Sequence, residues 1–597
     1  MRETPFGFFL GPDLDPKESV DISSVAEAGA DGWEKKRHPI VGTTNPPGRR
    51  NRIPHVTENE EQRRGRPGPT RLLLGALSGV LAGLAALAVA GAVAGGVRPQ
   101  AGPVVAVGGA AIDRTPAAVK DWAIRNFGTD DKLVLQSGIL GVLALFALVL
   151  GVVALRFRRT GAAGVLLFGA VGALAATGRP DSTGVVDALP SVVGAVVAAV
   201  VLYVLVGRLA PREPRPAGEN GPAAVAEGGP RPGTEWDRRG FVIAASATAA
   251  ASAGAGLLGR SLNGSSGRDA VASREAVVLP APASPAPAVP EGAGSRVAGV
   301  SPFVTPNADF YRVDTALVVP KVDATRWRLR IHGTGVARPL SLSYADLLRR
   351  ELIERDITLT CVSNEVGGPY VGNARWIGVR LADLLAECGV RPPSRGGRAD
   401  QLVARSVDGM TIGSPVEDVL DGRDALLAVG MNGEPLPFAH GFPVRMVVPG
   451  LYGFVSACKW IKDLELTTFD AYDPYWVRRG WAKRAPIKTE SRIDTPKPFA
   501  RPKAGPVMVA GVAWAQHRGI DKVEVRVDDG PWQQARLAAE DTRDTWRQWS
   551  FPWQAVKGGH TLTVRATDRT GATQTEKRAR TIPDGAGGWH SVVVTVD

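Results

Sequence analysis

The sequence predicts a multi-domain fold with an N-terminal α-helical membrane region, a central α+β domain and a C-terminal β-sandwich. Three observations predict it. The chain has 597 residues, which is too many for a single hydrophobic core. Five uncharged apolar runs, about the length of membrane-crossing helices, lie in its first half. Short runs of alternating polar and apolar residues, separated by glycine turns, fill residues 503–597.

The apolar runs are predicted to follow a polar tail and to cross the membrane. Residues 1–70 are rich in Pro, Gly and charge, which predicts a disordered cytoplasmic tail. Four runs then form a four-helix membrane region over residues 71–210, and a weakly hydrophobic fifth run ends the segment 211–260. No Asp, Glu, Lys, Arg or His lies inside a run, so we expect an anchor in the lipid bilayer and neither an ion pathway nor a bis-histidine haem. The runs are Leu72–Val97, Leu133–Leu155, Gly161–Gly178, Ala188–Gly207 and Gly240–Gly259.

The positions of the basic residues predict how the apolar runs are oriented in the membrane. Arginines gather in the tail, between the second and third runs, and after the fourth, which places these segments in the cytoplasm and the connections 98–132 and 179–187 outside. The fifth run begins at Arg238-Arg239-Gly240-Phe241, which is similar to a twin-arginine export signal. An ordinary basic flank before a membrane helix is the alternative. The sequence thus predicts a multi-pass protein of the cell membrane whose C-terminal half lies on the extracytoplasmic face.

Charge and cysteine content narrow the classes of partner and site. The chain has 71 basic and 59 acidic residues, a formal net charge of +12. Much of the excess lies beside the apolar runs, so we expect lipid and no nucleic acid as a partner. The three cysteines, Cys361, Cys388 and Cys458, are too few for a disulfide framework and too widely spaced for a zinc site. Cys388 lies among leucines of a predicted helix and is expected in the core.

The C-terminal half is predicted to be globular after a linker. Residues 261–300 are rich in Pro and Ala, which predicts a semi-extended tether. Over residues 301–502, strand-like runs such as 326–333 mix with helix-like runs such as 343–353, which is typical of an α+β domain. The β-sandwich of residues 503–597 carries no cluster of acid and base residues, so we expect a structural or association role.

Two stretches carry the candidate chemistry. In "TLTCVSNEVGG", Cys361 stands where a strand-like run gives way to a glycine-bearing loop. In "MNGEPLPFAHGFPVRMVVPGLYGFVSACKWI" (431–461), His440, Arg445 and Lys459 lie beside glycines that let backbone approach a ligand. An imidazole, a guanidinium and an ammonium in such a place suit a phosphate-bearing group. Solvated surface charge is the alternative.

Several motifs, in the same order over residues 300–597, resemble the sulfite oxidase family of molybdopterin-dependent oxidoreductases, in a membrane-anchored bacterial type. The motifs are "DFYRVDTALVVP" (309–320), "TLTCVSN" (358–364), "NARWIGVRLADLL" (373–385), "MNGEPLP", "HGFPVRMVVPG" and "CKWI". The C-terminal segment, with "GVAWA" (511–515), is similar to the family's immunoglobulin-like dimerisation domain. The resemblance implies a molybdenum–molybdopterin cofactor and a homodimer formed through the C-terminal domain.

The resemblance also implies residues that hold the cofactor. Cys361 is implied as the protein thiolate ligand, and a soft thiolate suits a metal already held by the two sulfurs of a pterin dithiolene. His440, Arg445 and Lys459 match family positions that hold the pterin and its phosphate. The other implied cofactor contacts are Tyr311, Arg312, Asn364 and Arg375.

The residues expected near the substrate match the family pattern less completely. Arg312 matches an arginine near the family's anionic substrate, and Trp481 stands where a substrate-loop tyrosine is expected. Glu365 occupies a place where an arginine is expected, and Asp314 lies in a Val-Asp pair where Asn-His is usual. These departures remove positive charge from the expected sulfite pocket. The arginines that could restore it are Arg478, Arg479 and Arg492.

We therefore expect oxygen-atom transfer to or from a small oxyanion or sulfur compound, with sulfite oxidation as one candidate reaction. The chain has no haem attachment motif, so the electrons would be exchanged with a separate external carrier. A sulfoxide-type reductase on the same cofactor is one alternative. The others are a hydrolase that uses Cys361 with His332 or His440, and a non-enzymatic cell-surface binding protein.

Overall fold

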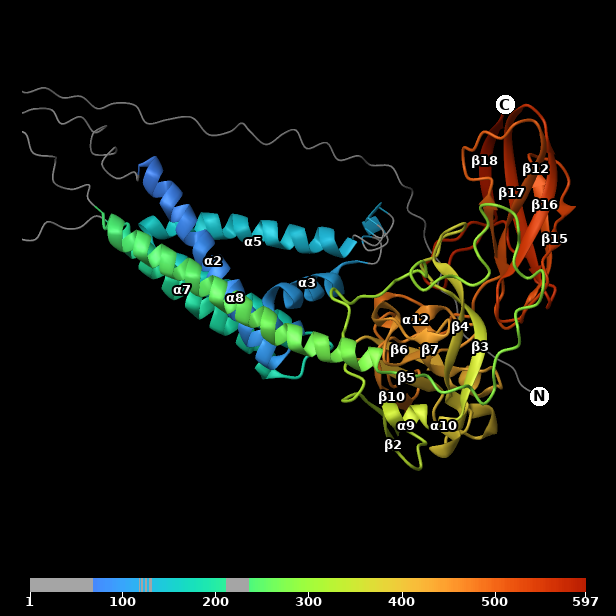
Figure 1. Cartoon of the computed structure of the whole chain (residues 1–597), viewed down its shortest axis with the longest axis horizontal. Helices are drawn as coiled ribbons and strands as arrows, with labels where there is room; N and C mark the ends of the chain where they lie inside the picture. Colours follow the sequence, from blue (N-terminus) through green and yellow to red (C-terminus); the bar gives the residue numbers. More distant parts are fainter. Residues whose placement is uncertain (1–67, 117–118, 120–121, 124–125, 128–130, 211–235) are drawn as a thin grey trace, which may run out of the picture. The chain divides into compact units, whose positions relative to one another are not determined.

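Helices of the N-terminal half carry the apolar runs. The computed structural model describes residues 68–210 and 236–597, apart from 117–118, 120–121, 124–125 and 128–130. The predicted tail up to residue 67 and the segment 211–235 lie outside the described residues. In the described part of the chain, five helices are long and apolar enough to cross a membrane. The helices of this half (Figure 1) are α2 (Pro69–Val97), α3 (Pro103–Arg114), α5 (Asp131–Arg156), α6 (Arg158–Thr177), α7 (Leu189–Arg208) and α8 (Arg238–Glu275).

Small residues let these helices approach closely. A Cβ atom on Gly79 of α2 would lie 1.9 Å from the carbonyl oxygen of Ala147 on α5. One on Gly151 of α5 would lie 2.1 Å from the carbonyl oxygen of Gly75. Larger side chains would therefore push the two helices apart.

Ion pairs join the ends of the helices. Arg98, just after α2, pairs with Asp181 at 2.7 Å and with Asp187 at 2.6 Å, and both carboxylates are buried. At the other end of α7, Arg208 pairs with Asp237 at 2.9 Å. Asp237 also accepts a hydrogen bond of 2.9 Å from Gly240 N and so caps α8. The end of α7 and the start of α8 therefore lie together.

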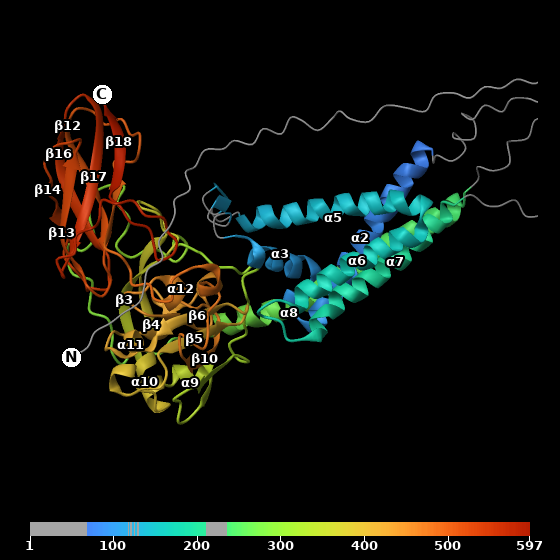
Figure 2. The same ribbon diagram turned by 180° about the vertical axis from the view of Figure 1, so that it is seen from behind.

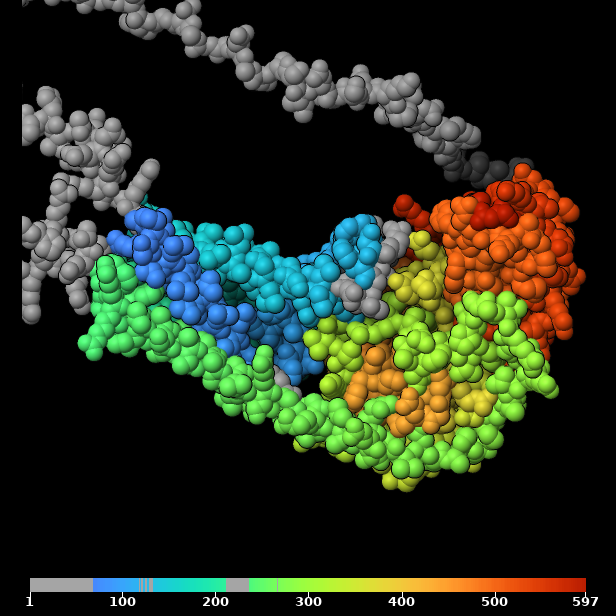
Figure 3. Space-filling view, turned by 45° about the horizontal axis from the view of Figure 1, so that its top comes forward, coloured from blue at the N-terminus to red at the C-terminus, as the bar shows by residue number. Residues whose placement is uncertain are grey.

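The linker lies on the domains that follow it. Helix α8 continues to Glu275, beyond the apolar run that the sequence marks, because its last turn contacts the central domain. Arg274 Nε donates to Leu436 O at 2.8 Å. Farther along, Glu354 N donates to Ser284 O at 2.9 Å, and Ala539 N donates to Gly292 O at 3.1 Å. The Pro/Ala segment thus crosses the surface of both C-terminal domains (Figure 3) instead of extending freely.

The central domain is α+β, as predicted, and contains two five-stranded sheets. In the first sheet the strand order is β2-β1-β10-β5-β6, and only the pairing of β1 with β10 is parallel. The second has the order β3-β4-β7-β8, with β9 paired to β7. Their strands are β1 (Arg328–Gly333), β2 (Leu340–Ser343), β3 (Leu352–Thr360), β4 (Val371–Arg380), β5 (Gln401–Ser406), β6 (Thr411–Pro415), β7 (Leu426–Met431), β8 (Glu434–Pro435), β9 (Arg445–Val447) and β10 (Ile461–Thr467).

Short helices connect these strands and pack against the core. They are α9 (Tyr344–Leu348), α10 (Leu381–Glu387), α11 (Val416–Leu420) and α12 (Gly453–Ser456). A capping box of Ser343 and Asp346 starts α9 where the sequence predicts a helix. The predicted helix over 343–353 is too long, because Leu352 and Ile353 are buried in β3 and pair with β4. Cys388 is fully buried in the core, as expected.

The C-terminal part consists of two four-stranded sheets around a second core (Figure 2). One has the order β11-β12-β16-β15 and the other β14-β13-β17-β18. Since β11 belongs to the first of these sheets, this part begins before residue 503. The strands are β11 (Glu490–Thr495), β12 (Gly505–Trp514), β13 (Ile520–Val527), β14 (Gln533–Gln534), β15 (Arg536–Leu537), β16 (Arg547–Ala555), β17 (Gly558–Asp568) and β18 (His590–Val596).

Candidate active site

Cys361 follows the last residue of β3 and begins a tightly held loop. Its backbone N–H donates to Tyr370 O at 2.9 Å, and Asn364 N donates to Cys361 O at 3.0 Å. The Asn364 side chain accepts from Tyr370 N at 2.8 Å. Cys361 as a residue is 9% exposed and lines a cavity, so a ligand in that cavity can reach it while bulk water has little access. Asn364 therefore holds the loop that presents Cys361.

The C-terminal sheets hold the strand that carries Cys361. The Gln516 side-chain amide donates to Thr358 O and to Thr360 Oγ1, both at 3.0 Å. Trp546 N donates to Thr358 Oγ1 at 2.7 Å. These residues are more than 150 positions from Cys361, and no local pattern in the sequence links them to the site.

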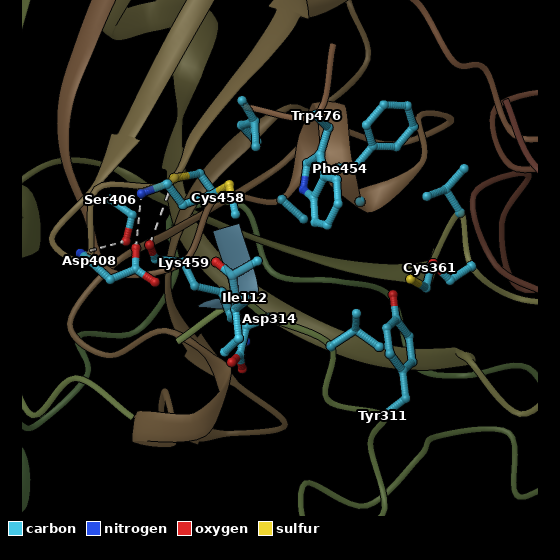
Figure 4. A pocket seen from close by; sticks show the side chains of 18 of the residues that line it. Ile112, Tyr311, Asp314, Cys361, Ser406, Asp408, Phe454, Cys458, Lys459 and Trp476 are labelled. Carbon is cyan, nitrogen blue, oxygen red and sulfur yellow. Dashed lines mark hydrogen bonds and ion pairs between the residues drawn. The ribbon is translucent and has the colours of Figure 1, made fainter. Parts of the chain in front are cut away.

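A cavity of about 330 Å³ lies beside Cys361. Cys361 and Tyr311 face it at one end, and Asp314, Lys459 and Cys458 lie toward the other (Figure 4). Burial raises the pKa of the Tyr311 hydroxyl, and the nearby Cys361 raises it further, so this hydroxyl remains a hydrogen-bond donor. The cavity thus joins a thiol to a group of charged side chains.

Arg445 is a buried cation on the cavity wall. Its guanidinium carbon lies 4.9 Å from the ring centre of Trp376, and Nη1 donates to His440 O at 3.3 Å. Its Nε is buried without a hydrogen-bond partner, and no carboxylate of the described residues lies within 4.0 Å of it. Burial lowers the pKa of Arg445 to about 10, so it is still charged at neutral pH. A buried charge of this kind requires an anion.

His440 lies beside Arg445 as a neutral side chain. Its Nε2 is 3.0 Å from Asn307 O, and its ring packs edge-on against Phe310 with 5.5 Å between centres. Burial lowers the pKa of His440 to about 4, and the Arg445 charge contributes to this. At neutral pH it can orient a polar ligand but adds no charge.

Lys459 belongs to a cluster centred on Asp314. Lys459 Nζ lies 2.7 Å from Asp314 Oδ2, and Arg312 Nε lies 3.1 Å from the same atom. Lys132, from the first turn of α5, pairs with Asp314 Oδ1. Burial alone would raise the pKa of Asp314, but Lys459, Lys132 and Arg312 together hold it well below its usual range. The sequence analysis noted Asp314 only as a departure and did not find Lys132, which is 182 positions away.

Some expected site residues are placed elsewhere. Arg375 is not on the cavity wall, and its guanidinium binds Asp356 at 2.9 and 2.6 Å. Arg312 faces Asp314 and does not line the cavity. Trp481 does line it, together with Trp476 and Phe454. This part of the wall is therefore aromatic.

None of the arginines expected to restore positive charge lines the cavity. Arg479 lies over the Tyr475 ring at 3.5 Å, and Arg492 pairs with Asp494 at 2.7 Å. Arg478 is exposed. Of the histidines weighed for a hydrolase, His332 lies 3.0 Å from Asp463 and away from the cavity.

The side chains on the cavity wall fit a cofactor that supplies most of the metal ligands itself. Among the described residues, no three His, Cys, Asp or Glu side chains gather in a way that could hold a metal ion. One thiol and a set of buried cations remain, which suits a metal bound mainly by an anionic organic group. These side chains therefore fit a site for a phosphate-bearing metal cofactor.

Comparison with known proteins identifies the family. Residues 316–476 match the family described as "Oxidoreductase molybdopterin binding domain". The chain is 31% identical to rat (Rattus norvegicus) mitochondrial sulfite oxidase over 292 residues, 42% of this chain and 53% of that protein. It is 33% identical to the uncharacterized oxidoreductase YuiH of Bacillus subtilis over 162 residues, 27% of this chain and 75% of that protein. The chain thus spans about half the length of the mitochondrial sulfite oxidases that it matches.

A solved structure is also similar. The sulfane dehydrogenase SoxCD of Paracoccus pantotrophus is 25% identical, with a TM-score of 0.43, over 50% of this chain and 84% of that one. The family matches confirm the resemblance seen in the sequence. The chain belongs to the sulfite oxidase family of molybdopterin oxidoreductases, and the cofactor that this membership implies is molybdenum–molybdopterin.

Proposed function

We propose that this protein is a membrane-anchored molybdenum oxidoreductase that transfers an oxygen atom to or from a small sulfur-compound substrate. Electrons would be exchanged with a separate carrier. The observation that carries the proposal is that Cys361 and Arg445 line the same cavity and that Arg445 has no carboxylate of the described residues within 4.0 Å. A cofactor that carries an anionic phosphate would pair with Arg445, and its metal could take the Cys361 thiolate as a further ligand.

The proposed roles follow from the contacts of each side chain. Cys361 would bind the metal, and the bonds of Asn364 within the loop would fix the direction of the thiol. Arg445, Lys459 and neutral His440 would hold the pterin and its phosphate. Tyr311 would donate a hydrogen bond beside the metal position. When bound, the cofactor supplies two-electron redox chemistry and oxygen-atom transfer.

The substrate side of the cavity favours reduction of an uncharged sulfoxide as a second candidate reaction. Trp476, Trp481 and Phe454 give this wall an aromatic surface. Arg312, Arg478, Arg479 and Arg492 do not line the cavity, and Lys132 and Lys459 on its wall pair with Asp314. A sulfite dianion would therefore depend mainly on Arg445 for positive charge. A neutral sulfoxide loses less hydration on entering such a wall.

The membrane arrangement is also part of the proposal. The twin-arginine-like motif at the start of α8 would lead the folded C-terminal half to the extracytoplasmic face. The connection 98–132, which is expected outside, supports this, because Asp113 and Lys132 both contact the central domain. The two C-terminal sheets would form an immunoglobulin-like sandwich and associate as a homodimer. A reporter fused after Ala276 should be active only outside the cytoplasm, and cytoplasmic activity would contradict this arrangement.

Metal content tests the central proposal. The full chain should be purified in detergent from a host that makes molybdopterin, and molybdenum per chain measured for the wild type and Cys361→Ser. We expect near-stoichiometric molybdenum in the wild type and little in the variant. A metal-free wild-type protein would refute the proposal. Parallel assays of sulfite oxidation and sulfoxide reduction then give the direction of the reaction.

A further inference from the structure

The membrane region contributes a charged side chain to the cofactor site. Lys132 lies in the first turn of α5, lines the same cavity as Cys361 and pairs with Asp314. Asp314 is 5% exposed, and Lys132 is 16% exposed. Both are therefore shielded, which makes their charges count far more than those of a surface pair.

The charge cluster around Asp314 has an excess of cations. Three cations, Lys132, Lys459 and Arg312, share this single carboxylate. Asp408, a second buried acid of the cavity wall, also interacts with Asp314 and Lys459, and burial raises its pKa. A phosphate monoester carries about −1.5 to −2 at pH 7 and accepts charge-assisted hydrogen bonds from ammonium groups. Lys132 and Lys459 both line the cavity and both reach Asp314, so their ammonium groups are placed to donate such bonds.

Separate contacts place α3, which packs against α5, on the central domain. The Tyr475 hydroxyl donates to Asp113 Oδ1 of α3 at 2.7 Å, and Arg479 Nη2 donates to Asp113 O at 2.9 Å. Asp181, in the connection before α7, approaches Gly409, where a Cβ atom would lie 2.3 Å from Asp181 N. Gly409 has a φ of +85°, a conformation that favours glycine. The position of Lys132 thus does not depend on the Asp314 pair alone.

We propose that Lys132 is a cofactor-binding residue that contacts the phosphate of the pterin together with Lys459, while Arg312 stays on Asp314. This inference rests on the proposed function. It gives the membrane helices a second role, because α5 would complete the cofactor site as well as anchor the chain. In the absence of the phosphate, Asp314 holds the three cations together.

Cofactor retention by the full chain tests this role. Wild type, Lys132→Met, Lys132→Arg and Asp314→Asn would be purified in detergent from a host that makes molybdopterin. Molybdenum and pterin bound per chain would be followed during dilution. We expect Lys132→Met to release the cofactor at least about tenfold faster, the loss expected for one charge-assisted bond. Lys132→Arg should stay close to the wild type. Lys321→Met is the matched control, since Lys321 is exposed and does not line the cavity.

Asp314→Asn separates phosphate binding from simple docking. Both Lys132→Met and Asp314→Asn break the same ion pair, but only Lys132→Met removes a cation. Phosphate binding predicts that Asp314→Asn retains the cofactor at least as well as the wild type. Equal loss in the two variants, or no change in Lys132→Met, would overturn the inference while leaving the proposed function intact. A wild-type chain that holds neither molybdenum nor pterin would overturn both.

Discussion

Replacing Arg445 by methionine should abolish cofactor binding without weakening the cofactor-free protein. Burial lowers the pKa of Arg445 to about 10. Arginine in water has a pKa near 12.5, and one pKa unit is worth about 1.4 kcal/mol, so the buried charge costs on the order of 3 kcal/mol at neutral pH. The cation–π contact with Trp376 returns about 1–2 kcal/mol. Methionine keeps the apolar stem, so the cofactor-free variant should gain about 1–2 kcal/mol.

The assay has two parts. The first measures thermal unfolding, in detergent, of the full chain made in a host without molybdopterin. The second measures the molybdenum content of the full chain made in a host that supplies molybdopterin. The matched control is Arg492→Met, because Arg492 is equally buried but paired with Asp494 at 2.7 Å. This control leaves a buried carboxylate unpaired and should cost about 3–5 kcal/mol. If cofactor-free Arg445→Met melts several degrees below the wild type, or binds molybdenum normally, the assignment of Arg445 to an anionic ligand is wrong.

Three further changes test other parts of the site. Cys361→Ser should remove molybdenum yet move the melting temperature of the cofactor-free chain little, because the two side chains are similar in size; a large loss of stability would point to a packing role. Burial lowers the pKa of His440 to about 4, so the folded state resists its protonation and stability falls as the pH drops from about 6.5 to 4. His440→Gln should flatten the dependence of melting temperature on pH in that window, and an unchanged slope would contradict this. Burial raises the pKa of Glu490 to about 8, so its ionisation destabilises the fold as the pH rises from about 4.5 to 8. Glu490→Gln should therefore melt higher than the wild type at pH 8.5 but not at pH 4.5, and equal melting at both would refute it.

The sequence predicted those features that local pattern encodes. Uncharged apolar runs mark the long apolar helices, because a helix that can cross a bilayer needs about 20 such residues in succession. The placement of Cys361 at the end of a strand is confirmed, since the run of β-branched residues before it forms β3. The helix over 343–353 was predicted too long because pairing with β4 outweighs local helical spacing.

Features that depend on distant contacts could not be predicted. Asp356 lies directly opposite Arg375 in the register of β3 with β4, which explains why Arg375 is turned away from the cavity. A single sequence does not give that register. Lys132 likewise reads as an ordinary polar flank of a membrane run, and only the fold brings it to Asp314.

The bonds from Gln516 and Trp546 to β3 have a consequence for biosynthesis. The strand that presents Cys361 gains these partners only after more than 150 further residues have been made. His590, near the end of the chain, lies against Gly367 in the loop after Cys361. A chain still on the ribosome therefore lacks a finished site, and contacts this distant in sequence form slowly. The cell must complete translation before the cofactor can be inserted, and a protein truncated before β18 should remain empty.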